Sequence, residues 1–137
     1  MLTGGCFCGK VRYEAGGEPF DLCLCHCESC RKTTGAPAVA WMSVRPEAFR
    51  FTAGEPAAFA SSDTGLRRFC RDCGAQLTFQ DSRLDEVDVA TASLDDPSAA
   101  APQDQIWVQS RLPWMAALNS LPELPRGHGA APARSSL

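Results

Sequence analysis

The sequence has no excess of positive charge and no long apolar run. Its 13 Lys and Arg residues are outnumbered by 16 Asp and Glu residues, which gives a net charge of -3 and a pI near 5.3. Because nucleic-acid phosphates require a basic surface, this balance predicts no nucleic-acid partner. No segment approaches the roughly 20 apolar residues of a membrane-spanning helix, so we expect no membrane partner either.

Histidine is also scarce, since His26 and His128 are the only two in the chain. His128 lies in a segment rich in Gly, Ala and Pro, and no Ser-His-Asp triad can be argued from the sequence. The first residues contain no basic stretch followed by an apolar one, the pattern of a secretory signal. We therefore expect a cytoplasmic protein whose cysteines stay reduced.

Cysteine, in contrast, is abundant. The eight cysteines form a Cys-x-Cys pair, a dense central group and a Cys-x-x-Cys pair: Cys6, Cys8, Cys23, Cys25, Cys27, Cys30, Cys70 and Cys73. Reduced cysteines at these spacings chelate a soft cation well, whereas a disulfide across one or two residues is strained. The spacing therefore predicts zinc sites rather than a disulfide framework.

The reach of the Zn–S bond divides the central group. With a bond of about 2.3 Å, the Cα atoms of two ligands lie at most about 7 Å apart. On a strand, residues i and i+2 are about 6.6 Å apart and share a face, so Cys25 and Cys27 can bind one ion, but Cys23 and Cys27 would be about 13 Å apart. A turn in the next two residues returns Cys30 to the ion. We predict a zinc site of Cys25, Cys27 and Cys30 with an open fourth position.

Two alternatives would close this site. A turn of the chain could bring in Cys23, or His26 could swing in, and either would give an inert structural zinc. His26 lies between two ligands and would point to the opposite face of a strand, where we expect a supporting hydrogen bond or a packed, partly exposed imidazole. An open site would instead hold an exogenous thiol as thiolate, ready to attack an electrophilic carbon.

The two remaining pairs complete one another as a closed four-thiolate site. Cys6 and Cys8 belong to an N-terminal turn, whereas Cys70 and Cys73 belong to a knuckle far along the chain. Such a site is structural, and its metal binding contributes to the free energy of folding. Two independent redox pairs are the alternative, which the spacing disfavours.

Short alternating segments separated by Gly and Pro predict a mainly β fold. After a tight turn over 4–9, the expected strands are 10–14, 20–27, 38–44, 57–61, 65–69, 75–79, 87–92 and 106–108. Short helical turns are expected at 28–34, 45–49 and 114–118. From Arg126 onward there is no periodicity, so we predict a single zinc-binding domain over 1–125 and a disordered tail over 126–137.

Charged residues near the cysteines are ambiguous. Five cations adjoin the motifs and could offset thiolate charge, although each one alone is expected in a solvated basic rim: Arg31, Lys32, Arg67, Arg68 and Arg71. Six acidic residues are expected to cap turns and face solvent: Asp72, Asp85, Glu86, Asp88, Asp95 and Asp96.

The ordered cysteine motifs resemble the glutathione-dependent formaldehyde-activating enzyme family. The resemblance is carried by residues 5–13, 25–32 and 69–74, with weaker matches at 94–97, 106–107 and 113–114. It implies a compact Mss4-like β fold of short antiparallel strands, with zinc knuckles, few short helices and two zinc ions per chain. It assigns the structural zinc to Cys6, Cys8, Cys70 and Cys73, and the catalytic zinc to Cys25, Cys27 and Cys30.

The resemblance also implies an activity. The chain would be a carbon–sulfur lyase-type enzyme similar to S-(hydroxymethyl)glutathione synthase, in which glutathione or a similar thiol adds to, or leaves, a small electrophile such as formaldehyde. The alternative is a non-catalytic zinc-stabilised β module that binds a protein partner through Trp41, Trp107 or Trp114, although tryptophans are more often buried in a core. The oligomeric state is not predicted.

Overall fold

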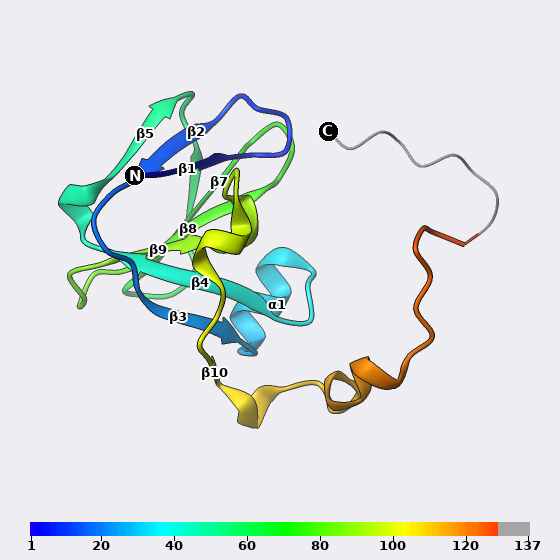
Figure 1. Cartoon of the computed structure of the whole chain (residues 1–137). Helices are drawn as coiled ribbons and strands as arrows, with labels where there is room; N and C mark the ends of the chain where they lie inside the picture. The colour runs from blue at the N-terminus through cyan, green and yellow to red at the C-terminus, as the bar shows by residue number, and fades with distance from the viewer. Residues whose placement is uncertain (129–137) are drawn as a thin grey trace.

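Two β-sheets form the body of the protein (Figure 1). The structure is a computed structural model and describes residues 1–128. The smaller sheet is antiparallel, in the order β1-β2-β5, and consists of β1 (Leu2–Gly5), β2 (Arg12–Ala15) and β5 (Phe49–Ala53). The mainly β prediction is confirmed.

The larger sheet has seven strands in the order β10-β3-β4-β9-β8-β7-β6. Its members are β3 (Phe20–Cys25), β4 (Val39–Val44), β6 (Ala57–Ala60), β7 (Gly65–Phe69), β8 (Gln76–Asp81), β9 (Val87–Ala90) and β10 (Asp104–Ile106). All neighbours are antiparallel except β10, which pairs in parallel with β3. The edge strand β10 therefore attaches the C-terminal part of the chain to β3.

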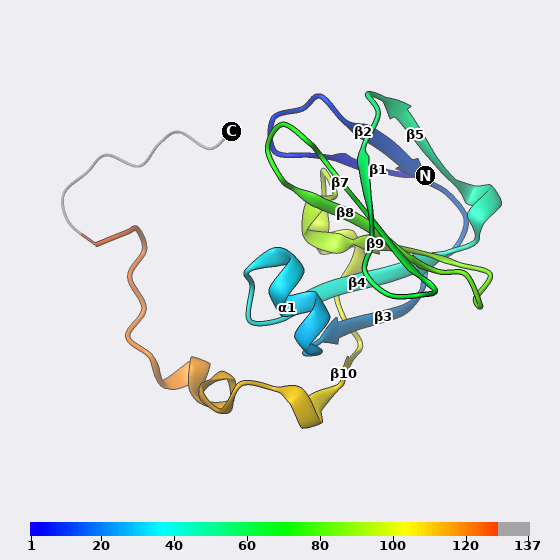
Figure 2. The ribbon, with the colours of Figure 1, turned by 180° about the vertical axis from the view of Figure 1, so that it is seen from behind.

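Helical structure is short, as the sequence predicts. Among residues 1–128 the α-helical residues are those of α1 (Glu28–Thr34), which ends at Gly35 in the left-handed conformation with φ 73°. The 3-10 turns are η1 (Pro46–Ala48), η2 (Thr91–Ser93), η3 (Pro97–Ala100), η4 (Val108–Ser110) and η5 (Pro113–Ser120). Figure 2 shows α1 beside β3 and β4, away from the small sheet.

The core lies between the two sheets. Tyr13 of the small sheet packs among fully buried side chains of the large sheet, including Met42, Leu77 and Val89. Burial of an apolar side chain of this size stabilises the fold by about 1.5–3 kcal/mol. A second, smaller cluster surrounds Trp41 and contains Cys25 and Cys30, so one cysteine motif is built into the apolar interior.

Two strands, β1 and β5, were not predicted from the sequence, and a third, β10, lies at a different position than expected. Two of the glycines that predicted a turn over 4–9, Gly4 and Gly5, lie in β1 instead. Gly4 is needed there, because a Cβ at this position would be 2.3 Å from the Tyr13 hydroxyl. β5 follows η1 directly and was not expected. The strand expected at 106–108 lies at 104–106 instead, since Trp107 has a left-handed φ of 55° and ends it.

Beyond β10 the described chain leaves the body as an arm, residues 107–128 (Figures 1 and 2). Most of its side chains are exposed, including Trp107 at 56% and Trp114 at 53%. The tail expected over 126–137 falls mostly on residues 129–137, which lie outside the described residues. Within residues 1–128 we find no helix with the length and apolar character needed to cross a membrane.

Candidate metal centres and the adjoining cavity

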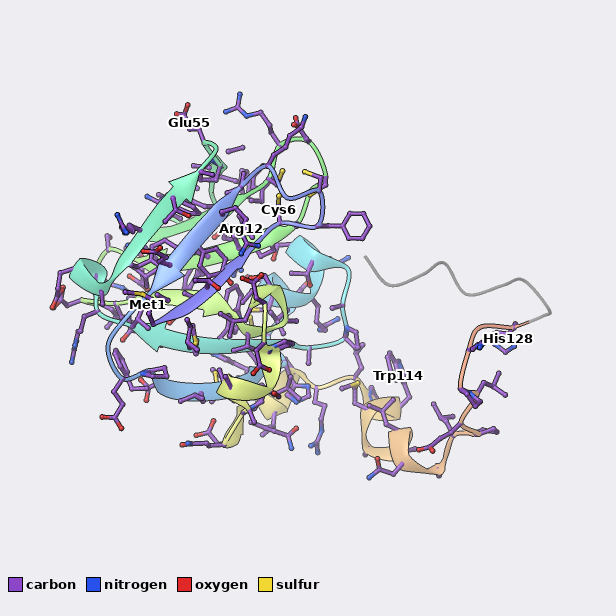
Figure 3. All side chains as sticks on the ribbon, turned by 45° about the horizontal axis from the view of Figure 1, so that its top comes forward. Met1, Cys6, Arg12, Glu55, Trp114 and His128 are labelled. Carbon is purple, nitrogen blue, oxygen red and sulfur yellow. The ribbon has the colours of Figure 1, made fainter. Side chains whose placement is uncertain are left out.

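Four cysteines meet where a turn of the small sheet lies next to a turn of the large sheet. Cys6 and Cys8 lie in the turn between β1 and β2, and Cys70 and Cys73 in the turn between β7 and β8. In each turn a left-handed glycine follows the second cysteine: Gly9 with φ 78° and Gly74 with φ 75°. Glycine adopts this conformation without strain, so both turns can fold back around a metal. Figure 3 shows Cys6 within this group of sulfur atoms.

The four sulfur atoms fit a tetrahedral zinc site. All lie within 4.8 Å of one another, with Cys6 Sγ 3.5 Å from Cys8 Sγ and Cys8 Sγ 3.7 Å from Cys70 Sγ. A tetrahedron of Zn–S bonds requires separations of about 3.8 Å. The Val11 amide donates to Cys6 Sγ at 3.2 Å. Although burial opposes ionisation of Cys6, this bond and the neighbouring thiols lower its pKa to about 6.

The second cluster is built where β3 meets α1. Cys25 ends β3, Cys27 caps α1 and Cys30 lies in its first turn. Their three sulfur atoms lie within 4.8 Å of one another, and Cys30 Sγ is 3.5 Å from Cys25 Sγ. The Cys30 amide donates to Cys27 Sγ at 3.2 Å, which fixes the turn. Three soft sulfur donors at this spacing also fit zinc.

Neither alternative fourth ligand belongs to this cluster. Within residues 1–128, the mutually close ligand atoms at this point are the three sulfurs and do not include Cys23 or His26. His26 is fully buried; its Nε2 lies 2.8 Å from Gln105 Oε1, and its amide donates to the Ile106 carbonyl at 3.1 Å. The histidine therefore connects β3 to β10. The hydrogen bond agrees with the expectation, but the expected partial exposure is wrong, because β10 covers the imidazole.

A cavity of about 700 Å³ adjoins the three-cysteine cluster. Cys25, Cys27 and Cys30 all line it, and Trp41 and Phe79 contribute apolar walls. Ile106 at the end of β10 lines it, and the arm reaches it through Trp107 and Ser110. Carboxylates make up much of the remaining lining: Asp21, Glu28, Asp81, Glu86, Asp88 and Asp104.

Arg67 is buried beside this cluster, which corrects its expected place in a solvated rim. Its side chain is 4% exposed, its guanidinium carbon lies 4.6 Å from the centre of the Phe79 ring, and its Nη2 lies 3.9 Å from Cys30 Sγ. Nε donates to Ser61 Oγ at 3.2 Å, whereas Nη1 is buried without a protein partner. The Cys25 thiol and, to a smaller degree, Arg67 lower the pKa of Cys30 to about 5 against the effect of burial.

The sequence names Arg67 only as one of five cations near the motifs and does not predict its burial. Alternation along β7 would place Leu66 inside, but Gly65 and Arg67 are buried and Leu66 is partly exposed. The side chain is accommodated because Phe79 on the neighbouring strand β8 pairs opposite Arg67 and covers its guanidinium. Only the cross-strand register shows this contact.

Asp88 and Glu86 also depart from the expectation that they face solvent. Asp88, on β9, is partly buried and accepts a hydrogen bond of 2.6 Å from Ser43 Oγ. Burial, followed by the charges of Glu86 and Asp21, raises the pKa of Asp88 to about 6. The other four acidic expectations agree with the structure. Asp96 caps η3, Asp85 is exposed, and Asp72 and Asp95 form exposed ion pairs.

Comparisons with known proteins agree with the cysteine motifs. Residues 1–110 match the family described as glutathione-dependent formaldehyde-activating enzyme. Over 76 residues the chain is 32% identical to an uncharacterized lyase of Schizosaccharomyces pombe, a match that covers 56% of this chain. It spans 55%, about half, of that relative's length.

A solved structure agrees with the fold. The crystal structure of a Rhodobacter sphaeroides protein superposes with a TM-score of 0.59 at 26% identity, covering 75% of this chain and 98% of that one. The family match extends over both cysteine clusters and most of the described residues. The chain therefore belongs to the glutathione-dependent formaldehyde-activating enzyme family.

Proposed function

We propose that this protein is a zinc-dependent carbon–sulfur lyase-type enzyme that joins a small-molecule thiol, glutathione or a similar compound, to a small electrophile such as formaldehyde, or reverses that addition. One observation carries the proposal. The three-sulfur cluster of Cys25, Cys27 and Cys30 lines a cavity large enough for small molecules and has no fourth protein ligand in the described chain. A closed structural site would have neither feature.

The three cysteines would hold one ion, and the chain around them would prepare the site. Zinc bound there supplies positive charge that lowers the pKa of an exogenous thiol. Arg67 offsets the remaining negative charge of three thiolates and one divalent ion. Trp41 and Phe79 keep part of the cavity apolar, which strengthens electrostatic interactions within it.

In the forward reaction a thiol sulfur forms a bond to the carbonyl carbon of the electrophile. The π electrons move to the carbonyl oxygen, and a proton equivalent to the one lost by the thiol reaches that oxygen from solvent. The Arg67 guanidinium lies beside the cluster, with its Nη2 3.9 Å from Cys30 Sγ. Its Nη1, which has no protein acceptor, can donate a hydrogen bond to the oxygen as negative charge develops there. Arginine stays protonated, so it stabilises this charge rather than giving up its proton.

The four-cysteine cluster has a different proposed role. Cys6, Cys8, Cys70 and Cys73 would hold a structural zinc that ties the β1–β2 turn to the β7–β8 turn. A reducing compartment such as the cytoplasm suits both clusters, because every ligand must remain a free thiol.

Turnover of the zinc-loaded protein tests the proposal. We expect thiol-dependent consumption of formaldehyde, which Cys27→Ser abolishes while circular dichroism stays native. Cys23→Ser is the matched control, because Cys23 lines the same cavity but lies outside the cluster. Failure of every thiol tested to bind or react would contradict the proposal.

The exposed tryptophans of the arm favour a second candidate, a non-catalytic module that binds a protein partner. Trp107 and Trp114 are accessible, whereas Trp41 is buried. Isothermal titration with glutathione and other thiols at millimolar concentration separates the two candidates: no heat with any of them favours the binding module.

A further inference from the structure

The cavity beside the three-cysteine cluster has a marked excess of negative charge. Six carboxylates and one arginine line it. Of the six, Asp81 forms an ion pair with Arg83 at 2.5 Å. Among residues 1–128, the side-chain ion pairs found include none of the other five carboxylates: Asp21, Glu28, Glu86, Asp88 and Asp104.

Arg67 does not balance these carboxylates. Three thiolates around a divalent ion carry one net negative charge, and Arg67 lies next to Cys30, where it offsets that charge. The five carboxylates other than Asp81 are thus left without a cation of their own among the residues that line the cavity. Outside the lining, the charge of Arg45 acts to lower the pKa of Glu86, but burial and the charge of Asp21 still keep that pKa raised.

Asp88 is the most deeply placed of these groups. Its hydrogen-bond donor is the Ser43 hydroxyl, and the charges that act on it come from Glu86, Asp21 and Cys30, all negative when ionised. A partly buried carboxylate without a cation is costly, since it loses water and gains no opposite charge. A positively charged ligand group would supply the missing partner.

Arg67 gives an independent indication that a ligand enters the cavity. The side chain is 4% exposed and lines the cavity, yet its Nη1 has no protein acceptor. A buried N–H without an acceptor costs free energy unless water or a ligand satisfies it. The cavity is therefore suited to a ligand with an acceptor oxygen near Arg67 and a cation near Asp88.

Backbone strain is also concentrated at this cavity. In the described chain, the residues other than glycine with positive φ are Asp21, at 47°, and Trp107, at 55°. Both line the cavity, and Asp21 lies where the register of β3 against β4 shifts, between Phe20 and Cys23. Such conformations are retained mainly where they serve a site.

We propose that the thiol used by this protein is positively charged, and that Asp88, Glu86 and Asp21 form the subsite for its cationic group. The inference rests on the proposed function and specifies its thiol. The sulfur would reach the cluster of Cys25, Cys27 and Cys30, with the electrophile's oxygen at Arg67. Glutathione, with two carboxylates and one amine, matches this charge pattern poorly.

A set of thiols of matched shape tests the subsite by isothermal titration into the zinc-loaded protein. Thiocholine carries a trimethylammonium group that cannot condense with formaldehyde, and 3,3-dimethylbutane-1-thiol is its uncharged isostere. We expect thiocholine to bind at least about tenfold more tightly than the isostere, and 3-mercaptopropionate and glutathione to bind more weakly than thiocholine.

Charge-removing variants locate the effect. Asp88→Asn and Glu86→Gln should each reduce the preference for thiocholine, and the second variant keeps the test valid if the first does not fold. Glu55→Gln is the control, because Glu55 is exposed in the turn between β5 and β6 and does not line the cavity (Figure 3). It removes the same charge and should leave the preference unchanged.

The possible failures can be told apart. If thiols bind without regard to charge, or glutathione binds most tightly, the cation subsite is overturned and the proposed function stands. Choline, which has no sulfur, is titrated in parallel. If choline binds and Asp88→Asn abolishes its binding while no thiol binds more tightly than its sulfur-free analogue, the subsite stands and the proposed function fails. If neither choline nor any thiol binds, both are overturned.

Discussion

Arg67 differs most from the sequence expectation, because it is buried beside the cysteine cluster rather than solvated. A guanidinium covered by Phe79 and next to Cys30 holds a fixed positive charge at the cysteine cluster. Buried charges are rare unless they are paired, and the natural partner here is the ionised cysteine cluster. Arg67 is thus placed to compensate the thiolates and to contact a substrate oxygen.

Arg67→Met should lower kcat by about 100-fold, because it removes the donor to the developing oxygen charge. Arg67→Lys keeps the positive charge but lacks the planar guanidinium, so its kcat should lie between those of the wild type and Arg67→Met. Steady-state kinetics with the zinc-loaded protein checks this, and Arg68→Met, at a more exposed neighbouring position, is the control. An unchanged kcat in Arg67→Met, with normal zinc content, would remove Arg67 from the mechanism.

Asp88 predicts a pH dependence of stability. Its pKa is raised to about 6 in the folded protein, above the value near 3.9 of an unfolded chain, so its contribution to stability is complete below about pH 4 and is lost as the pH rises through 6. Asp88→Asn should therefore exceed the wild type in free energy of unfolding by about 2 kcal/mol above pH 7 and by less near pH 5. Urea unfolding from pH 5 to 8 measures the difference, and a constant gap would contradict the assignment.

At the residue scale the sequence predicts the cysteines better than their surroundings. Reach along the chain is enough to separate Cys23 from the other central cysteines, and the structure brings together the same two groups of sulfurs. Which of these sulfurs bind metal stays a prediction. The positions of Arg67 and Asp88 depend on strand register and burial. Neither can be predicted from the presence of a charged residue in the sequence.

At the scale of elements, most strands were predictable from the sequence, whereas β1 and β5 were not and β10 was displaced. β4 and β9 follow the expected segments closely, because their apolar residues face a core. β1 contains two glycines, so its sequence predicts a turn. In the structure the Tyr13 side chain packs closely against Gly4. Tertiary packing thus decides the structure of β1 over its local preference.

Gly4→Ala tests this explanation of β1. The new Cβ would lie 2.3 Å from the Tyr13 hydroxyl and 2.6 Å from the Ser93 carbonyl, so the strand must move. We expect a loss of about 2–3 kcal/mol in the free energy of unfolding. Gly16→Ala is the control, since its Cβ meets atoms no closer than 3.4 Å and should cost less than about 1 kcal/mol. Equal effects at both positions would contradict the packing argument.

At the scale of the whole molecule, the four-cysteine cluster joins the two sheets. Cys6 and Cys8 come from the small sheet's hairpin and Cys70 and Cys73 from the large sheet, so a metal there connects distant parts of the chain. The three-cysteine cluster connects only β3 to α1. The two clusters should therefore differ in what their loss does to the fold.

Cys73→Ser should lose one zinc and lower the melting temperature by more than about 10 °C, because metal binding at this site contributes to folding. Cys27→Ser should lose the other zinc and shift the melting temperature by only a few degrees. Calorimetry with zinc analysis of each variant measures both effects. The reverse pattern, with Cys27→Ser unfolding the protein, would contradict this division of roles.

A zinc ion held by Cys25, Cys27 and Cys30 should keep one coordination position for an exogenous ligand. Anomalous diffraction at the zinc edge, with ligands resolved at each ion, tests it most directly. We expect two ions per chain, one bound by Cys6, Cys8, Cys70 and Cys73, and one bound by three cysteines and a water or thiol. A second ion closed by Cys23, His26 or any other fourth protein ligand would contradict it.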